Sequence, residues 1–168
     1  MDGLDWGAPD FSTLCRRQQT LNVSLPYRGS TGPLNLLIDS TGIKAEGEGE
    51  WNARKHEGSK RHVWRKIQIG IDEETLEVRA VQVTGSNIGD APMLPELLNQ
   101  IPSYQDIGSV TADGAYDTRK CHEAIAARDA HAVVPPRKNA KPWKPTSTGA
   151  IARHDAVHAR RYLGRTLW

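Results

Sequence analysis

The 168-residue chain is long enough for one domain with a buried core, and 38% of its residues are hydrophobic while 25% are charged. This composition excludes a disordered chain, and no apolar run approaches the roughly 20 residues that a membrane span requires. The net charge of +2 is small, but the basic residues are concentrated in residues 51–70 and after residue 134, with the acidic residues concentrated between these blocks.

The N-terminal segment predicts a helix and a linker ahead of the main domain. It has no basic stretch followed by an apolar one, so we expect no secretory signal and a cytoplasmic protein without a membrane partner. Residues 11–21 have the spacing of a short amphipathic helix, which Asp10 or Ser12 can cap. LPYRGSTGP then has the composition of a loop. We therefore expect a helical segment and linker in 1–30 and one domain in 31–168.

Periodicity predicts the remaining elements. Short apolar or alternating runs predict strands, and helical spacing of apolar residues predicts helices. Asp90 and Asp117 are placed to cap two helices, and the polar turn at Asp72–Thr75 joins an antiparallel hairpin. The order of elements predicts a mixed α/β sheet with one antiparallel edge. The expected strands cover 34–39, 65–72, 76–84, 107–113 and 130–136, and the expected helices cover 91–101, 118–128 and 149–165.

Two carboxylates follow comparable strands. Asp39 and Asp113 each stand at the C-terminal end of a predicted core strand, followed by a glycine or a small polar residue. Neighbouring strand ends would bring them together, and two close carboxylates favour a divalent cation such as Mg²⁺, which also binds phosphate oxygens. Such a site suits phosphodiester hydrolysis and transfer. From these residues alone, the alternative stays open that each aspartate only caps a turn.

Long segments of the chain resemble one known family. LNLLIDSTGIK, GEGEWNARKHEGSKRHVWRKIQIGIDEET, GSNIGDAPMLPELLNQI and TADGAYDTRKCHEAI are similar, in this order, to the core of bacterial DDE transposases of the insertion-sequence-five family. The resemblance covers nearly the whole chain and implies an α/β fold of the ribonuclease-H-like type, a mixed sheet with flanking helices. It also implies that Asp39 and Asp113 are the first two catalytic acids and ligands of Mg²⁺ or Mn²⁺.

The third acid of that family has no counterpart in this sequence. In the family it is a glutamate in a Tyr-x-x-Arg-x-x-x-Glu segment, and YLGRTLW resembles only the approach to it. Glu123 lies on another expected helix and is not taken as a substitute for the glutamate. The resemblance thus implies a fragment, in which 1–30 is the remnant of an N-terminal helical region and 31–168 is a catalytic core truncated before its final helix. We expect an exposed apolar face where that helix would pack.

The basic blocks suit contacts with a phosphate backbone, and the resemblance makes DNA the expected partner. A solvated hairpin loop and a disordered tail are the alternative interpretations. We expect double-stranded DNA, both transposon ends and target, as the ligand of a bacterial, nucleoid-associated protein, and we leave a homo-oligomer open. The residues expected to contact DNA are Arg54, Lys55, Lys60, Arg61, Arg65, Lys66, Arg137 and Lys138.

Together these features predict a transposase that cleaves and joins DNA strands, with water and then a DNA 3′-hydroxyl as nucleophiles. Whether this chain is itself an enzyme stays open, because the missing glutamate would leave the metal site underligated and its activity impaired. The alternatives are a catalytically inactive DNA-binding fragment and a nuclease of the same fold with another third acid. His154 and His158 have the spacing of a metal pair but no third ligand, so we interpret them as surface or DNA-facing residues.

Overall fold

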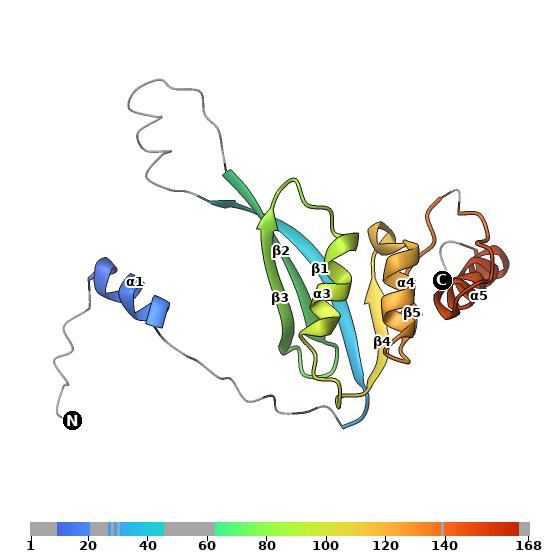
Figure 1. The fold of residues 1–168 in the computed structure, drawn as a ribbon, viewed down its shortest axis with the longest axis horizontal. Coiled ribbons are helices and arrows are strands. Elements are labelled where there is room, and N and C mark those ends of the chain that lie inside the picture. The colour runs from blue at the N-terminus through green and yellow to red at the C-terminus, as the bar shows by residue number, and fades with distance from the viewer. Residues whose placement is uncertain are drawn as a thin grey trace, which may run out of the picture.

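A computed structural model gives the fold and describes residues 10–20, 27, 29, 31–45, 63–138 and 140–164. None of the helices in these described residues is long and apolar enough to cross a membrane. The elements, drawn in Figure 1, are α1 (Phe11–Thr20), β1 (Leu34–Ala45), β2 (Val63–Asp72), β3 (Val78–Gly85), η1 (Ala91–Met93), α3 (Leu94–Asn99), β4 (Ile107–Ala112), η2 (Gly114–Tyr116), α4 (Arg119–Ala126), β5 (His131–Val133) and α5 (Thr148–Leu163), where η marks a 3-10 turn.

The sheet has five strands in the order β3-β2-β1-β4-β5. β2 runs antiparallel to β1 and to β3, whereas β4 runs parallel to β1 and β5 runs parallel to β4. α3 and α4 lie side by side on one face of the sheet, and α5 packs beside α4 (Figure 1). A mixed sheet in this order with flanking helices is the ribonuclease-H-like arrangement, so the predicted fold class is confirmed.

The core lies between the sheet and the helices α3 and α4. Leu34, Leu36 and Ile38 of β1 are buried because successive side chains of a strand point to opposite faces, and these three share one face. Burial of apolar surface at this interface is the main favourable contribution to folding. Other buried side chains of the core include Leu94, Leu97, Leu98, Ile101, Ile107, Val110, Tyr116, Cys121, Ile125 and Val134.

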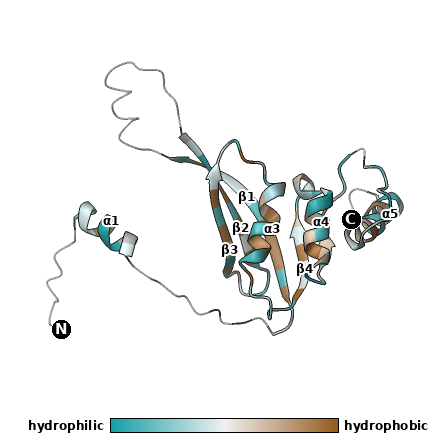
Figure 2. Cartoon of the chain, viewed as in Figure 1, coloured by the Kyte–Doolittle hydropathy of each residue, from teal (hydrophilic) through white to brown (hydrophobic). Residues whose placement is uncertain are grey.

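The hairpin of β2 and β3 turns its isoleucines away from this core. Gly70 pairs with Ile38 across the strands, and a β-carbon at Gly70 would lie 3.0 Å from the Ile38 side chain. The same face of β2 buries Gln68 and Asp72. On the other face Val83, which pairs with an isoleucine of β2, is 57% exposed. Figure 2 shows the hydrophobic residues on these strands, and Val78, Val81 and Val83 of β3 are exposed. The expectation of an exposed apolar face where a further helix would pack stays a prediction.

Three local predictions have different outcomes. Asp10 caps α1 as expected, because its carboxylate accepts a hydrogen bond from a backbone N–H of the first turn at 2.8 Å. The prediction that the first strand ends at Asp39 is wrong: β1 continues to Ala45, because it stays paired with β2 after its pairing with β4 has ended. Asp90 precedes η1 but does not cap it with its side chain, which instead accepts a hydrogen bond from Lys66 at 2.9 Å.

α5 approaches α4 so closely that Gly149 has no room for a side chain. A β-carbon at Gly149 would lie 2.6 Å from the backbone nitrogen of Glu123 and 2.6 Å from the carbonyl carbon of His122. Both are backbone atoms of a helix and cannot move aside without shifting α4. The glycine therefore sets the distance between the two helices.

We expect Gly149→Ala to lower the free energy of unfolding by about 1–3 kcal/mol, which is the usual cost of overpacking. Gly42→Ala is the matched control, because the nearest neighbour of a β-carbon there is 3.8 Å away. The control should leave the free energy unchanged or raise it by up to about 1 kcal/mol. Urea unfolding followed by circular dichroism measures both variants, and equal effects would contradict the close contact.

Candidate functional site

Asp39 and Asp113 lie side by side at the point where the parallel pairing of β1 with β4 ends. The last parallel pair between β1 and β4 joins Ile38 to Ala112, and the two aspartates are the next residues along the chain. Neighbouring strands are about 4.8 Å apart, so the two residues are direct neighbours, and both are exposed. The structure thus brings together the two acids singled out in the sequence, and their role stays a prediction.

A backbone N–H group holds one oxygen of each carboxylate. Ser40 N–H donates to Oδ1 of Asp39 at 2.7 Å, and Ala115 N–H donates to Oδ1 of Asp113 at 2.8 Å. The other oxygen of each carboxylate accepts no hydrogen bond from the part of the chain that the structure describes. Two oriented carboxylates form the hard oxygen donor set that Mg²⁺ or Mn²⁺ takes. The residues present therefore fit a divalent ion.

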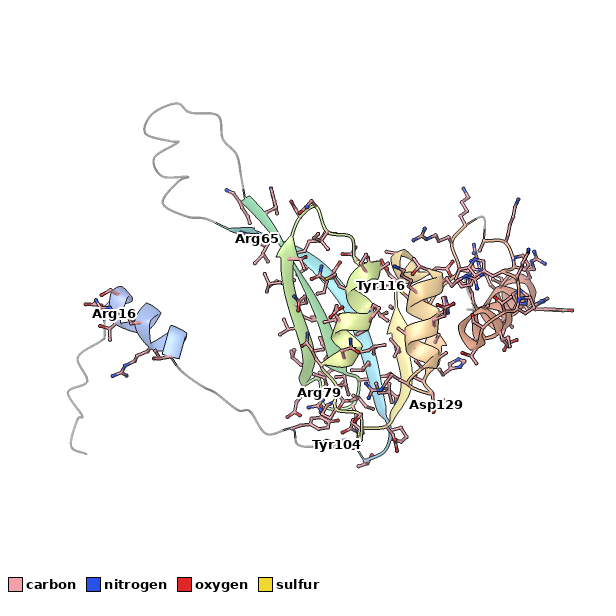
Figure 3. All side chains as sticks on the ribbon, in the orientation of Figure 1. Arg16, Arg65, Arg79, Tyr104, Tyr116 and Asp129 are labelled. Atoms are coloured by element: carbon pink, nitrogen blue, oxygen red, sulfur yellow. The ribbon has the colours of Figure 1, made fainter. Side chains whose placement is uncertain are left out.

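The hydroxyl of Tyr116 is an unsatisfied polar group near this pair. Tyr116 is 1% exposed, and its hydroxyl makes no hydrogen bond with a described residue. Burial raises the pKa of this hydroxyl, and the negative charges of Asp90, Asp113 and Asp39 raise it further. The Ser40 side chain partly opposes this rise in pKa. Tyr116, labelled in Figure 3, therefore keeps its proton.

A buried ion pair joins the turn after Asp113, which is η2, to α5. Asp117 and Arg153 are 5% and 3% exposed, and Nη2 of Arg153 donates to Oδ2 of Asp117 at 2.9 Å. Nε2 of His122 lies 3.2 Å from Oδ1 of the same carboxylate. The ring of Trp143 covers this cluster, with the Arg153 guanidinium carbon 3.8 Å from its centroid. The pair fixes the residues that follow Asp113 to a helix far along the sequence.

The prediction that Asp117 caps α4 is wrong. Thr118 is the cap, because its hydroxyl accepts a hydrogen bond from Cys121 N–H at 3.3 Å. Burial by itself would raise the pKa of the Asp117 carboxyl. Hydrogen bonds from His122, Arg153 and a backbone N–H outweigh burial and hold this pKa well below its usual range. Asp117 is therefore an ionised structural anchor.

The basic residues expected to contact DNA have different surroundings. Arg65 is exposed near the start of β2 (Figure 3), whereas Lys66 is paired with Asp90. Lys138 is exposed. Arg137 is also exposed, but its guanidinium donates to two carbonyl oxygens of η2. Arg54, Lys55, Lys60 and Arg61 lie outside the described residues.

Within the described residues, no group of three His, Cys, Asp or Glu side chains could hold a metal ion. Glu123 accepts a hydrogen bond from the Ser147 hydroxyl at 3.1 Å and thereby ties α4 to the start of α5. His154 and His158 contact each other edge to face, with ring centroids 6.2 Å apart. In the described structure these three side chains therefore make contacts within α5 or between α5 and α4.

Comparison with known protein families decides the affiliation of the chain. A family model described as a transposase DDE domain matches residues 30–167, and another with the same description matches residues 1–48. The first match spans most of the chain and includes Asp39 and Asp113. The chain belongs to the DDE transposase family. Members of this family generally use divalent metal ions, in agreement with the donor set of the two aspartates. The assignment to the insertion-sequence-five group of DDE transposases stays a prediction.

Sequence reasoning missed the residues that support the candidate acids of this DDE domain. Tyr116 and Asp117 stand in the same short motif, ADGAYD, as the second aspartate, and that position was a signal that could have been used. Arg153 gave no local signal, because its partner is 36 residues away in the chain. Arg137 was singled out only for its charge.

Asp117→Asn leaves the buried Arg153 without a counter-charge. We expect the free energy of unfolding at pH 7 to fall by about 3–5 kcal/mol, the usual cost of removing one partner of a buried ion pair. Asp155→Asn is the matched control at an exposed position of α5 and should change it by less than about 0.5 kcal/mol. Urea unfolding measures both variants.

The same pair has a predictable pH dependence. An unfolded aspartate has a pKa of about 3.9, and folding lowers the pKa of Asp117. The stability that the pair contributes is therefore fully present above the unfolded value and is lost as the pH falls through the folded value. The native chain should lose stability below about pH 4 more steeply than Asp117→Asn does. Equal slopes would contradict this role of the carboxylate.

Tyr116→Phe tests whether the buried hydroxyl is unsatisfied. The substitution keeps the ring and deletes a donor whose unmet hydrogen bond costs about 1–3 kcal/mol. Without added metal, the variant should therefore melt at the same temperature as the native chain or higher. Tyr162→Phe, at a position that is 89% exposed, is the control and should have no effect. A clear fall in melting temperature for Tyr116→Phe alone would mean that the hydroxyl has a partner.

Proposed function

We propose that this chain supplies the two-aspartate part of a transposase active site for DNA strand cleavage and strand transfer. The observation that carries the proposal is the adjacency of Asp39 and Asp113 after the last parallel pair of β1 and β4, in a chain of the DDE family. The two carboxylates would hold Mg²⁺ or Mn²⁺. Divalent ions held there would supply activation of the attacking oxygen and stabilisation of the leaving oxygen at a phosphate.

The residues of the chain would bind and orient the reacting groups. The backbone N–H groups of Ser40 and Ala115 fix one oxygen of each carboxylate, which leaves the second oxygen in a defined position. The Tyr116 hydroxyl is buried close to the two aspartates and would keep its proton, so it adds no negative charge beside them. Groups that are already oriented need no reorganisation during the reaction.

Double-stranded DNA, both transposon ends and target, is the partner we propose. Lys138 follows Arg137, whose side chain contacts the turn after Asp113, so an exposed cation lies near the two carboxylates. Lys141 and Lys144 are exposed in the loop that continues to α5. Such cations attract the phosphate backbone and make binding dependent on salt. Action as a homo-oligomer stays part of the hypothesis.

We further propose that the chain by itself cleaves DNA weakly. Its sequence holds no Tyr-x-x-Arg-x-x-x-Glu segment, and two carboxylates hold a divalent ion less firmly than three. The second candidate function is a catalytically inactive DNA-binding protein. The exposed lysines of the loop before α5 favour this candidate, because they would bind DNA whether or not a metal ion is present.

Nicking of labelled duplex DNA by the purified chain, with and without Mn²⁺, tests the proposal. We expect weak metal-dependent nicking that is lost in Asp113→Ala and kept in Asp155→Ala, a control at an exposed position of α5. Nicking that survives in Asp113→Ala would exclude this aspartate as a metal ligand. No nicking, together with salt-sensitive DNA binding, would select the DNA-binding candidate.

A further inference from the structure

We infer that Arg137 is a positioning residue for Asp113, and that its guanidinium clamps the turn that carries this carboxylate instead of contacting DNA. The inference rests on the proposed function of Asp113 as a metal ligand. From the sequence, a cation in a basic stretch would be expected to contact phosphate. The Arg137 side chain instead contacts backbone carbonyl oxygens of the protein itself.

Arg137 holds the turn with its side chain and with its backbone. Nε and Nη2 of Arg137 donate to the carbonyl oxygens of Gly114 and Ala115 at 3.3 and 3.0 Å. Its backbone N–H donates to Oδ2 of the buried Asp117 at 3.0 Å. Gly114 and Ala115 directly follow Asp113, and Ala115 N–H is the donor that holds the Asp113 carboxylate at 2.8 Å. One arginine thus contacts the turn at its beginning and at its end.

The segment of Arg137 fits closely against this turn. A β-carbon at Gly114 would lie 3.3 Å from the carbonyl oxygen of Pro135, so glycine permits the approach of the two segments. The planar guanidinium presents N–H groups in fixed directions and can therefore satisfy two carbonyl oxygens at once. A lysine ammonium carries the same charge without this fixed geometry. The contact depends on the shape of the arginine head group and not only on its charge.

α5 in turn holds Arg137 in place. Nη1 of Arg160 donates to the carbonyl oxygens of Pro136 and Arg137 at 2.6 and 2.9 Å. Arg153 pairs with the last acid of the turn and donates to the carbonyl oxygen of Lys141 at 2.9 Å. The described structure therefore contains a continuous set of contacts from α5 through Arg137 to the Asp113 turn. The position of the proposed metal ligand depends on a helix that contributes no ligand itself.

Arg137→Lys separates the geometry of this clamp from its charge. We expect the dissociation constant for Mn²⁺, measured by electron paramagnetic resonance on the DNA-free chain, to rise about tenfold, the lower end of effects for residues that orient metal ligands. The Ala115 amide should exchange with solvent at least about tenfold faster, as measured by nuclear magnetic resonance, because opening of the turn frees it. Circular dichroism checks that the variant is folded.

Lys138→Ala is the matched control, since it changes the neighbouring cation and leaves the clamp in place. We expect this variant to keep the native Mn²⁺ affinity and Ala115 exchange but to bind duplex DNA more weakly, with a smaller dependence on salt. Unchanged Mn²⁺ affinity and unchanged Ala115 exchange in Arg137→Lys would overturn the inference. If the native chain binds no Mn²⁺, the proposed function fails, and the Ala115 exchange decides the role of Arg137 by itself.

Discussion

The parallel pairing of β1 with β4 is the constraint on which the site depends. Because it ends at Ile38 and Ala112, the next residues, Asp39 and Asp113, are neighbours whatever packs on the sheet. Two adjacent carboxylates repel each other, and a cation relieves that repulsion. Backbone pairing that builds the core thus also creates the electrostatic conditions for binding a metal ion.

Much of the fold can be predicted from the sequence, because apolar periodicity reports which faces of strands and helices are buried. The end of β1 cannot be predicted in this way, since residues 40–45 are mostly polar or small and are held in a strand by pairing with β2. The choice between Asp117 and Thr118 as the cap of α4 is also not local. Both residue types are good caps. Asp117 does not cap α4 because its carboxylate is bound by Arg153 from a distant helix.

The two acids of the site can be found because each follows a run of core residues in the sequence, but the residues that support them cannot be found in this way. Arg137 and Arg153 stand in a basic stretch, and counting charges in the sequence cannot distinguish one cation from another. In the folded chain Arg153 is buried against Asp117, Arg137 holds the turn of Asp113, and Lys138 is exposed. Only contacts between distant segments distinguish a cation that organises the protein from one that meets solvent.

The orientation of β2 also bears on how the chain reaches its fold. A slip of β2 by one residue would exchange its two faces and place the isoleucines under the helices, a competing arrangement that buries more hydrocarbon. Asp72 opposes the slip, because it accepts hydrogen bonds from the Tyr27 and Thr75 hydroxyls at 3.0 and 2.6 Å in the native register. Gly70 opposes it as well by making room for Ile38. The hydrogen bonds of Asp72 and the missing side chain at Gly70 therefore favour the native register of β2 over one that would bury its isoleucines.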